Sequence, residues 1–191
     1  LAKEKGLKNI FVTNGFESRY EIEDIPNWLN GANVDLKSFN REYYKKVLKG
    51  DLEGVLETIQ LLKEKGVWVE VTTLVVPGSN DSREELEQIA QFIASVDRSI
   101  PWHISRFRPD YRERDKAPTP ISKLMEAYKI GKEAGLYYVY LGNVTLPAIT
   151  YCPRCGEELI VRYLFGVEKD LVTPHRGKCP KCGRLVEGVW R

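Results

Sequence analysis

Four cysteines, the only ones in this 191-residue chain, form two matched pairs near its C-terminus: Cys152, Cys155, Cys179 and Cys182. In each pair a proline follows the first cysteine and a glycine follows the second, which is typical of a tight turn that directs backbone amides toward sulfur. Two such turns facing each other predict a tetrahedral site of four thiolates, which suits zinc. A disulfide framework fits poorly, because the rest of the chain has no cysteine and nothing marks it as secreted.

Two alternatives for this site follow from the same residues. A rubredoxin-like iron or an iron-sulfur cluster also uses four thiolates. His175, four residues before Cys179, is an alternative ligand, although four cysteines already complete a tetrahedral set. Zinc is the favoured ion.

Composition narrows the class of protein. The 29 basic and 27 acidic residues are interspersed and give a net charge of +2, so no basic face for a nucleic-acid partner is evident. No apolar stretch of membrane-spanning length and no signal peptide are present, which predicts a cytoplasmic protein without a membrane partner. High charge with few glutamines favours a thermophilic source.

The elements that must position these residues alternate along the chain. Short apolar runs predict strands over 9–14, 33–37, 67–76, 102–107 and 136–141. Helical patterns fall between and after them, over 21–30, 41–48, 52–65, 81 or 82 to 94, and 121–134. The alternation predicts an α/β fold, a partial parallel (β/α) barrel over residues 1–148, with a C-terminal zinc ribbon over 149–191. The loop 108–120 follows a strand's carboxyl end, where such folds place their sites.

Charged residues stand in the second predicted strand. Asp35 and Lys37 flank Leu36, so both side chains point to one face of the sheet. If that face is a barrel interior, the pair must be neutralised by a partner or by a ligand. An internal salt bridge and a ligand site are equally good interpretations of this spacing.

Polar residues also stand in the other predicted strands. Asn14 ends the first, Thr72 and Thr73 lie in the third, and His103 lies in the fourth. Each alone is typical of an ordinary strand or core residue. Together they predict a ligand pocket at the mouth of a barrel.

Several short motifs, in this order, carry a family resemblance: VTNG at 12–15, VDLK at 34–37, TTLVVPG at 72–78 and PWH at 101–103. They resemble the later half of radical S-adenosylmethionine (SAM) enzymes related to pyruvate formate-lyase activating enzyme. A closer resemblance is to the radical SAM component of the AmmeMemoRadiSam system, carried by SNDS at 79–82, SRFRP at 105–109, YLGNV at 140–144 and TYCP at 150–153.

The resemblance implies a barrel that binds SAM and a four-iron four-sulfur (4Fe-4S) cluster and generates a 5′-deoxyadenosyl radical for hydrogen abstraction. It also implies an electron donor for the cluster and a substrate that the motifs do not identify, a protein being one option. Carried over by position, the residues that line the SAM pocket are Asn14, Asp35, Lys37, Thr72 and His103.

This chain departs from the family in four ways. It has neither the CxxxCxxC loop that holds the cluster nor the Gly-Gly-Glu motif that grips the methionyl amine. It also carries Val12 where activases have aspartate and Thr72 where they have arginine. The abrupt start at Leu1 therefore indicates an N-terminally truncated enzyme that is inactive alone. The alternative is a non-catalytic module whose zinc ribbon binds a protein partner.

Overall fold

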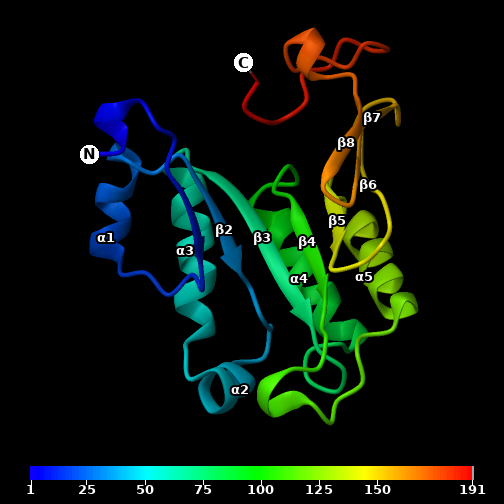
Figure 1. The fold of residues 1–191 in the computed structure, drawn as a ribbon. Coiled ribbons are helices and arrows are strands. Elements are labelled where there is room, and N and C mark those ends of the chain that lie inside the picture. Colours follow the sequence, from blue (N-terminus) through cyan, green and yellow to red (C-terminus); the bar gives the residue numbers. More distant parts are fainter. Residues whose placement is uncertain (191) are drawn as a thin grey trace.

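The computed structural model describes residues 1–190 (Figure 1). Five parallel strands form one open sheet in the order β1-β2-β3-β4-β5. The strands are β1 Ile10–Thr13, β2 Gly31–Asp35, β3 Trp68–Val75, β4 Trp102–Arg106 and β5 Val139–Gly142. Neighbours in the sequence are neighbours in the sheet, joined by helical crossovers, which confirms the predicted α/β fold.

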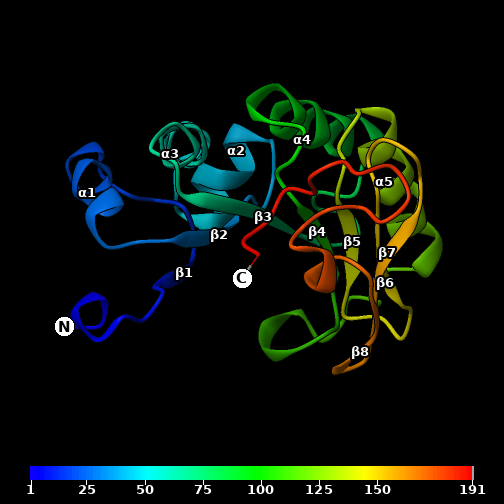
Figure 2. The ribbon, with the colours of Figure 1, turned by 90° about the horizontal axis from the view of Figure 1, so that it is seen from above.

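Helices connect the strands and lie over one face of the sheet (Figure 2). They are α1 Arg19–Asp24, α2 Arg41–Tyr43 with a π-helical turn over Tyr44–Leu48, α3 Leu52–Glu64, α4 Arg83–Val96 and α5 Ile121–Glu133. Short 3-10 turns cover Lys3–Lys5, Ile25–Asn27, Tyr111–Glu113 and Thr173–His175.

Local signals fix where these helices begin and end. Ser82, rather than Asp81, caps α4, because its hydroxyl accepts the backbone N–H of Glu85. The helix predicted over 21–30 begins earlier, at a capping box formed by Ser18 and Glu21. It passes into the 3-10 turn Ile25–Asn27, in which Pro26 lacks the N–H that a longer α-helix needs.

The main core lies between the sheet and α3, α4 and α5. Val34, Val71 and Ile104 from the strands are fully buried there, as are Ile59 and Ile89 from the helices. Burying each such side chain stabilises the fold by roughly 1.5–3 kcal/mol. The opposite face of the sheet, called the open face below, carries no helix within residues 1–190.

A second, antiparallel sheet forms the C-terminal part, in the order β6-β7-β8. Its strands are β6 Ala148–Tyr151, β7 Glu158–Tyr163 and β8 Gly166–Asp170. Together with the turns that follow up to Trp190, this sheet is called the ribbon below. It contacts β5 through Tyr140 Oη and Thr150 Oγ1, 2.8 Å apart, and it contacts the residue before β5 through Tyr138 Oη, which donates to Glu187 at 2.5 Å. The division at residue 148 stays a prediction.

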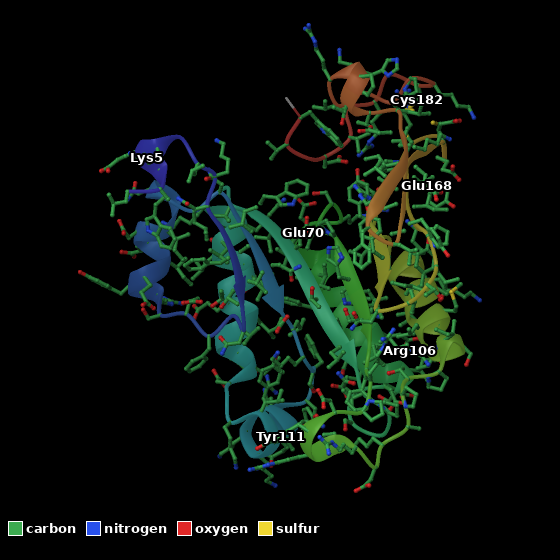
Figure 3. The ribbon with its side chains drawn as sticks, in the orientation of Figure 1. Lys5, Glu70, Arg106, Tyr111, Glu168 and Cys182 are labelled. Atoms are coloured by element: carbon green, nitrogen blue, oxygen red, sulfur yellow. The ribbon has the colours of Figure 1, made fainter. Side chains whose placement is uncertain are left out.

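The carboxyl ends of the strands and the part of the ribbon that carries Cys182 lie at opposite ends of the molecule. The carboxyl ends of β2 and β3 point toward α2 and the loop that carries Tyr111 (Figures 1 and 3). Cys182 lies at the other end of the molecule, and Glu70 lies between these ends (Figure 3). The part of the ribbon that carries Cys182 therefore lies toward the amino ends of the strands, away from the end where sites of such folds usually lie.

Candidate ligand pocket and metal centre

The four cysteines form one cluster. Their sulfurs all lie within 4.8 Å of one another, with 3.6 Å between Cys152 and Cys182 and 3.7 Å between Cys155 and Cys179. A tetrahedral ion with bonds of about 2.3 Å separates its sulfurs by roughly 3.8 Å, so the spacing fits a single metal ion. His175 is outside the cluster, because its Nδ1 hydrogen-bonds to the carbonyl of Leu171.

Two equivalent turns build this cluster. In each, the glycine after the second cysteine has a positive φ, 72° at Gly156 and 73° at Gly183. Each glycine donates its N–H to the carbonyl of the first cysteine of its pair, at 2.9 Å. Lys181 of one turn pairs with Glu157 of the other at 3.2 Å, which joins the two.

Electrostatics at the cluster favour a bound cation. Burial opposes ionisation of Cys179, but hydrogen bonds from the amides of Cys182 and Lys181 lower its pKa to about 7. At Cys155 the amide of Glu157 favours the thiolate, but burial and the three neighbouring sulfurs raise the pKa to about 12. Negative charges on sulfurs this close repel one another, so a bound cation would stabilise the cluster.

The predicted pocket residues share one row across the open face. Asp35 is registered with Thr72, Thr72 with His103, and His103 with Tyr140. Asn14 follows Thr13, which is registered with Val34, so Asn14 is level with Asp35. Asn14, Asp35, Thr72 and His103 are therefore level with one another, whereas Lys37, predicted to lie in the second strand, stands two residues beyond the end of β2 at Asp35.

Asp35 and Lys37 contact each other at 2.6 Å between Oδ2 and Nζ. Their side chains are 31% and 40% exposed, whereas Leu36 between them is fully buried. The prediction that both point to one face is thus confirmed. The salt bridge exists, but it is open to solvent rather than internal.

His103 has a partner that sequence reasoning missed. Its Nε2 lies 2.6 Å from Glu70 Oε2, and Trp68 Nε1 donates to the other carboxylate oxygen at 2.9 Å. The bond to His103 lowers the pKa of Glu70, against the opposing effect of burial. The alternation of side chains along a strand could have revealed this partner, because Glu70 stands two residues before Thr72 and so faces the same side of the sheet.

The other row residues have local partners. Thr72 Oγ1 donates to Asn33 Oδ1 at 2.7 Å. Asn14 accepts the N–H of Phe16 at 3.1 Å in a turn after β1 and is exposed. Val12, on the same face as Asn33, is 82% exposed.

A buried amide holds the chain beside Lys37. Asn80, 2% exposed, donates through Nδ2 to the carbonyls of Lys37 at 2.6 Å and Leu74 at 2.8 Å. Its Oδ1 accepts the N–H of Val76 at 2.7 Å. The hydroxyl of Tyr44 accepts the N–H of Lys37 at 3.0 Å, so both sides of the Lys37 backbone are fixed.

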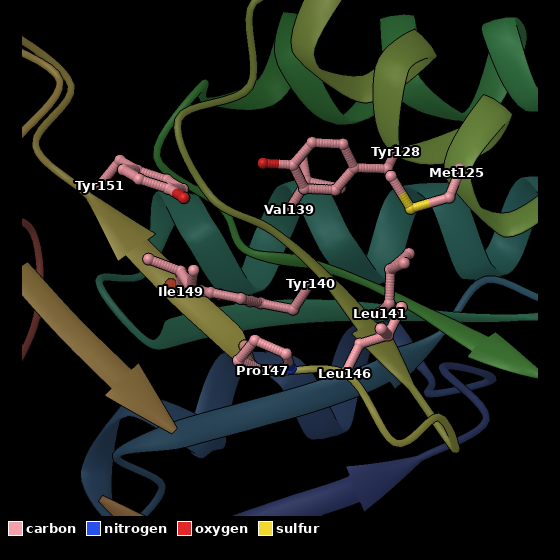
Figure 4. A pocket seen from close by; sticks show the side chains of 10 residues that line it. Met125, Tyr128, Val139, Tyr140, Leu141, Leu146, Pro147, Ile149 and Tyr151 are labelled. Carbon is pink, nitrogen blue, oxygen red and sulfur yellow. The ribbon is translucent and has the colours of Figure 1, made fainter. Parts of the chain in front are cut away.

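Two cavities adjoin β5. One, of about 280 Å³, lies between α5 and the segment joining β5 to β6 and has mainly apolar walls that include Met125, Leu146 and Tyr151 (Figure 4). The other, of about 580 Å³, lies between the open face and the ribbon and is lined by Glu70, His103 and residues of the ribbon. Tyr140 lines both.

Comparison with known proteins agrees with this fold. Residues 1–93 match the radical SAM superfamily. A protein of Methanocaldococcus jannaschii, described only as uncharacterised, is 41% identical over 192 residues, which cover 99% of this chain and 57% of that protein. The chain therefore spans little more than half the length of this relative.

Solved structures give the same class of fold. A domain of pyruvate-formate lyase-activating enzyme from Bacteroides vulgatus superposes with a TM-score of 0.63 and 15% identity, over 74% of this chain and 84% of that one. A radical SAM methyltransferase from Sphaerobacter thermophilus gives a TM-score of 0.57 and 11% identity, over 72% and 41%. The match over residues 1–93 confirms the predicted resemblance to radical SAM enzymes. The resemblance to the AmmeMemoRadiSam component stays a prediction.

No helix of residues 1–190 has the length and apolar character needed to cross a membrane. The cytoplasmic location and the thermophilic source stay predictions.

Proposed function

We propose that this chain is the later part of a radical SAM enzyme that binds SAM on its open face. The observation that supports this is the registered row of polar side chains, Asp35, Thr72 and His103, on a face without helices. A polar row across adjacent strands is unfavourable in a packed core and suits a ligand with several charged groups.

The residues fit the charged end of this ligand. SAM carries an ammonium and a carboxylate on its methionyl part. Asp35 would accept hydrogen bonds from the ammonium and Lys37 would donate to the carboxylate, each exchanging its present partner for one on the ligand. Asn14, Thr72 and His103 would line the rest of the pocket. Together with a 4Fe-4S cluster, SAM supplies a 5′-deoxyadenosyl radical for hydrogen abstraction.

The cluster itself does not fit residues of this chain. Its only cysteines are the four of the ribbon, and Figure 3 places Cys182 far from the carboxyl ends of the strands. A cluster of several irons also holds its ligating sulfurs further apart than a single ion does. We infer that these cysteines hold one structural zinc ion and that the cluster ligands lie elsewhere in the complete enzyme.

Substitution of Lys37 tests the SAM pocket. Lys37→Ala in the full-length protein removes a charged hydrogen bond worth about 1.5–3 kcal/mol, so SAM affinity should fall roughly ten- to hundredfold in a calorimetric titration. Because the Asp35–Lys37 pair is half exposed, the free energy of unfolding should fall by less than about 1 kcal/mol. Lys45→Ala, exposed and outside the row, is the matched control. Unchanged SAM affinity in Lys37→Ala would refute the pocket.

One observation favours the alternative of a protein-binding module. The hairpin between β7 and β8 exposes Leu164, Phe165 and Val167, and Phe165 is fully exposed. Apolar side chains gathered at a tip are what a protein partner covers. If Phe165→Ser abolishes capture of a partner while full-length protein binds no SAM, this module is the better description.

A further inference from the structure

The cavity between the open face and the ribbon has a lining that the SAM pocket does not explain. Its volume is about 580 Å³, within the usual size range of small-molecule sites. The sheet contributes Trp68 and Glu70, and the ribbon contributes Thr150, Arg162 and Trp190. Because both parts of the chain build it, the cavity depends on how the ribbon packs against the sheet.

The carboxylates of this cavity are already satisfied. Glu70 accepts hydrogen bonds from Trp68 Nε1 and pairs with His103 Nε2. Glu187 accepts the hydroxyl of Tyr138 at 2.5 Å and Arg184 Nη2 at 2.7 Å. Neither carboxylate therefore requires a cationic ligand.

Arg162, an exposed side chain, is the basic group of the lining without a direct ion pair, although its charge helps to lower the pKa values of Glu70 and Asp170. Its Nη1 donates to Thr150 Oγ1 at 3.1 Å, and its guanidinium lies 6.0 Å from the centre of the Tyr140 ring. Within residues 1–190 it forms no ion pair with a carboxylate. A guanidinium has five N–H donors in a planar fork that matches a carboxylate or a phosphate, so most of its donors stay available for an anion.

The aromatic wall of the cavity is held in place. Trp190 Nε1 donates to the carbonyl of Val186 at 2.8 Å. The ring lies against the backbone of Gly177, where an added Cβ would be only 2.2 Å from Trp190 Cδ1. A Cβ at Gly188 would also approach the ring, at 2.9 Å. Two glycines thus make room for a fixed indole ring, and Trp68 supplies a second.

We propose that this cavity binds a small aromatic anion, with its carboxylate or phosphate on Arg162 and its ring against Trp68 and Trp190. Binding does not depend on SAM. The further role of the anion as substrate rests on the function proposed above, since His103 lines this cavity and also belongs to the row that would hold SAM.

Ligand charge provides the first test, by calorimetric titration of the full-length protein. Benzoate and phenyl phosphate are the anionic probes, and benzyl alcohol and benzylamine are the neutral and cationic ones. We expect at least one anion to bind tenfold or more tightly than benzyl alcohol, and benzylamine to bind no better than the alcohol. The tighter of the two anions identifies the natural headgroup as carboxylate or phosphate. Equal affinity for anions and alcohol would overturn the proposal.

Variants locate the binding. Arg162→Gln should remove the tenfold preference for the anion, Arg162→Lys should keep part of it, and Arg114→Gln, an exposed arginine outside the cavity, should keep all of it. Trp190→Leu should weaken every aromatic probe at least fivefold. Melting curves establish that each variant is folded, and a folded Arg162→Gln that retains the preference contradicts the proposal.

The two proposals fail separately. Lys37→Ala should leave benzoate binding unchanged. If the wild-type protein binds the anion but not SAM, the radical SAM proposal fails and the anion site stands. The opposite result removes the anion site alone.

Discussion

Asn80 should be among the most sensitive polar positions of the fold. Its amide makes three hydrogen bonds, to the carbonyls of Lys37 and Leu74 and from the N–H of Val76, and it is 2% exposed. Each bond contributes about 0.5–1.5 kcal/mol net, so Asn80→Ala should lower the free energy of unfolding by about 3 kcal/mol. Asn80→Asp keeps the shape of the side chain but sets a carboxylate against two carbonyl oxygens, so its cost should be at least as large.

Urea unfolding followed by circular dichroism measures this loss. The variant and the wild type are compared at the same m value, the slope of the free energy of unfolding against urea concentration. Asn27→Ala is the control, because the Asn27 amide bonds to nearby Asp24 at an exposed site, and its cost should stay below about 0.5 kcal/mol. A loss below 1 kcal/mol for Asn80→Ala would show that this amide does not tie β2 to β3. The position of Lys37 would then need another explanation.

Three further changes test other parts of the structure. Gly131→Ala should destabilise the protein by about 1–3 kcal/mol in thermal melts, because the new Cβ would lie 2.9 Å from the ring of Trp102. This loss should outweigh the better helix propensity of alanine, and a stabilised variant would contradict the prediction. Glu70 has a folded-state pKa below its usual 4.5 because of His103, so its ionisation contributes stability above pH 4.5 that is lost as the pH falls through the lowered pKa. Glu70→Gln should therefore lose less stability between pH 5 and pH 3 than the wild type, and parallel curves would argue against the assignment. Purified protein should contain one zinc per chain, Cys155→Ser should lose it together with thermal stability, and a reddish protein with iron and no zinc would refute the metal assignment.

Local patterns predicted the elements well. Helical spacing and capping residues located α3, α4 and α5 to within a few residues. Strand ends were less certain, since the predicted strand over 136–141 begins only at Val139. Leu136 instead lies in the turn after α5, where its N–H donates to the carbonyl of Gly131 in the last turn of the helix. A short apolar run cannot show which of its residues pair with a neighbouring strand.

Contacts between distant segments were beyond sequence reasoning. Repeated motifs predicted the cysteine cluster because its two turns have the same local pattern. Glu70 and His103 are 33 residues apart, and their contact depends on the register between β3 and β4. Arg162 and Trp190 reach the cavity only because the ribbon packs against the sheet, and nothing in their sequence neighbourhood reports that packing.

The distance between the cysteines and the carboxyl ends of the strands has a chemical benefit for a radical enzyme. A free thiol gives up the hydrogen atom of its S–H bond readily, so a cysteine beside an organic radical would quench it before the substrate reacts. In this chain all four cysteines lie in the ribbon, and metal-bound thiolates have no S–H hydrogen to lose. In the radical chemistry proposed above, no thiol hydrogen of these four cysteines would then lie beside a radical formed over the open face, so this route to reducing the intermediate would be closed.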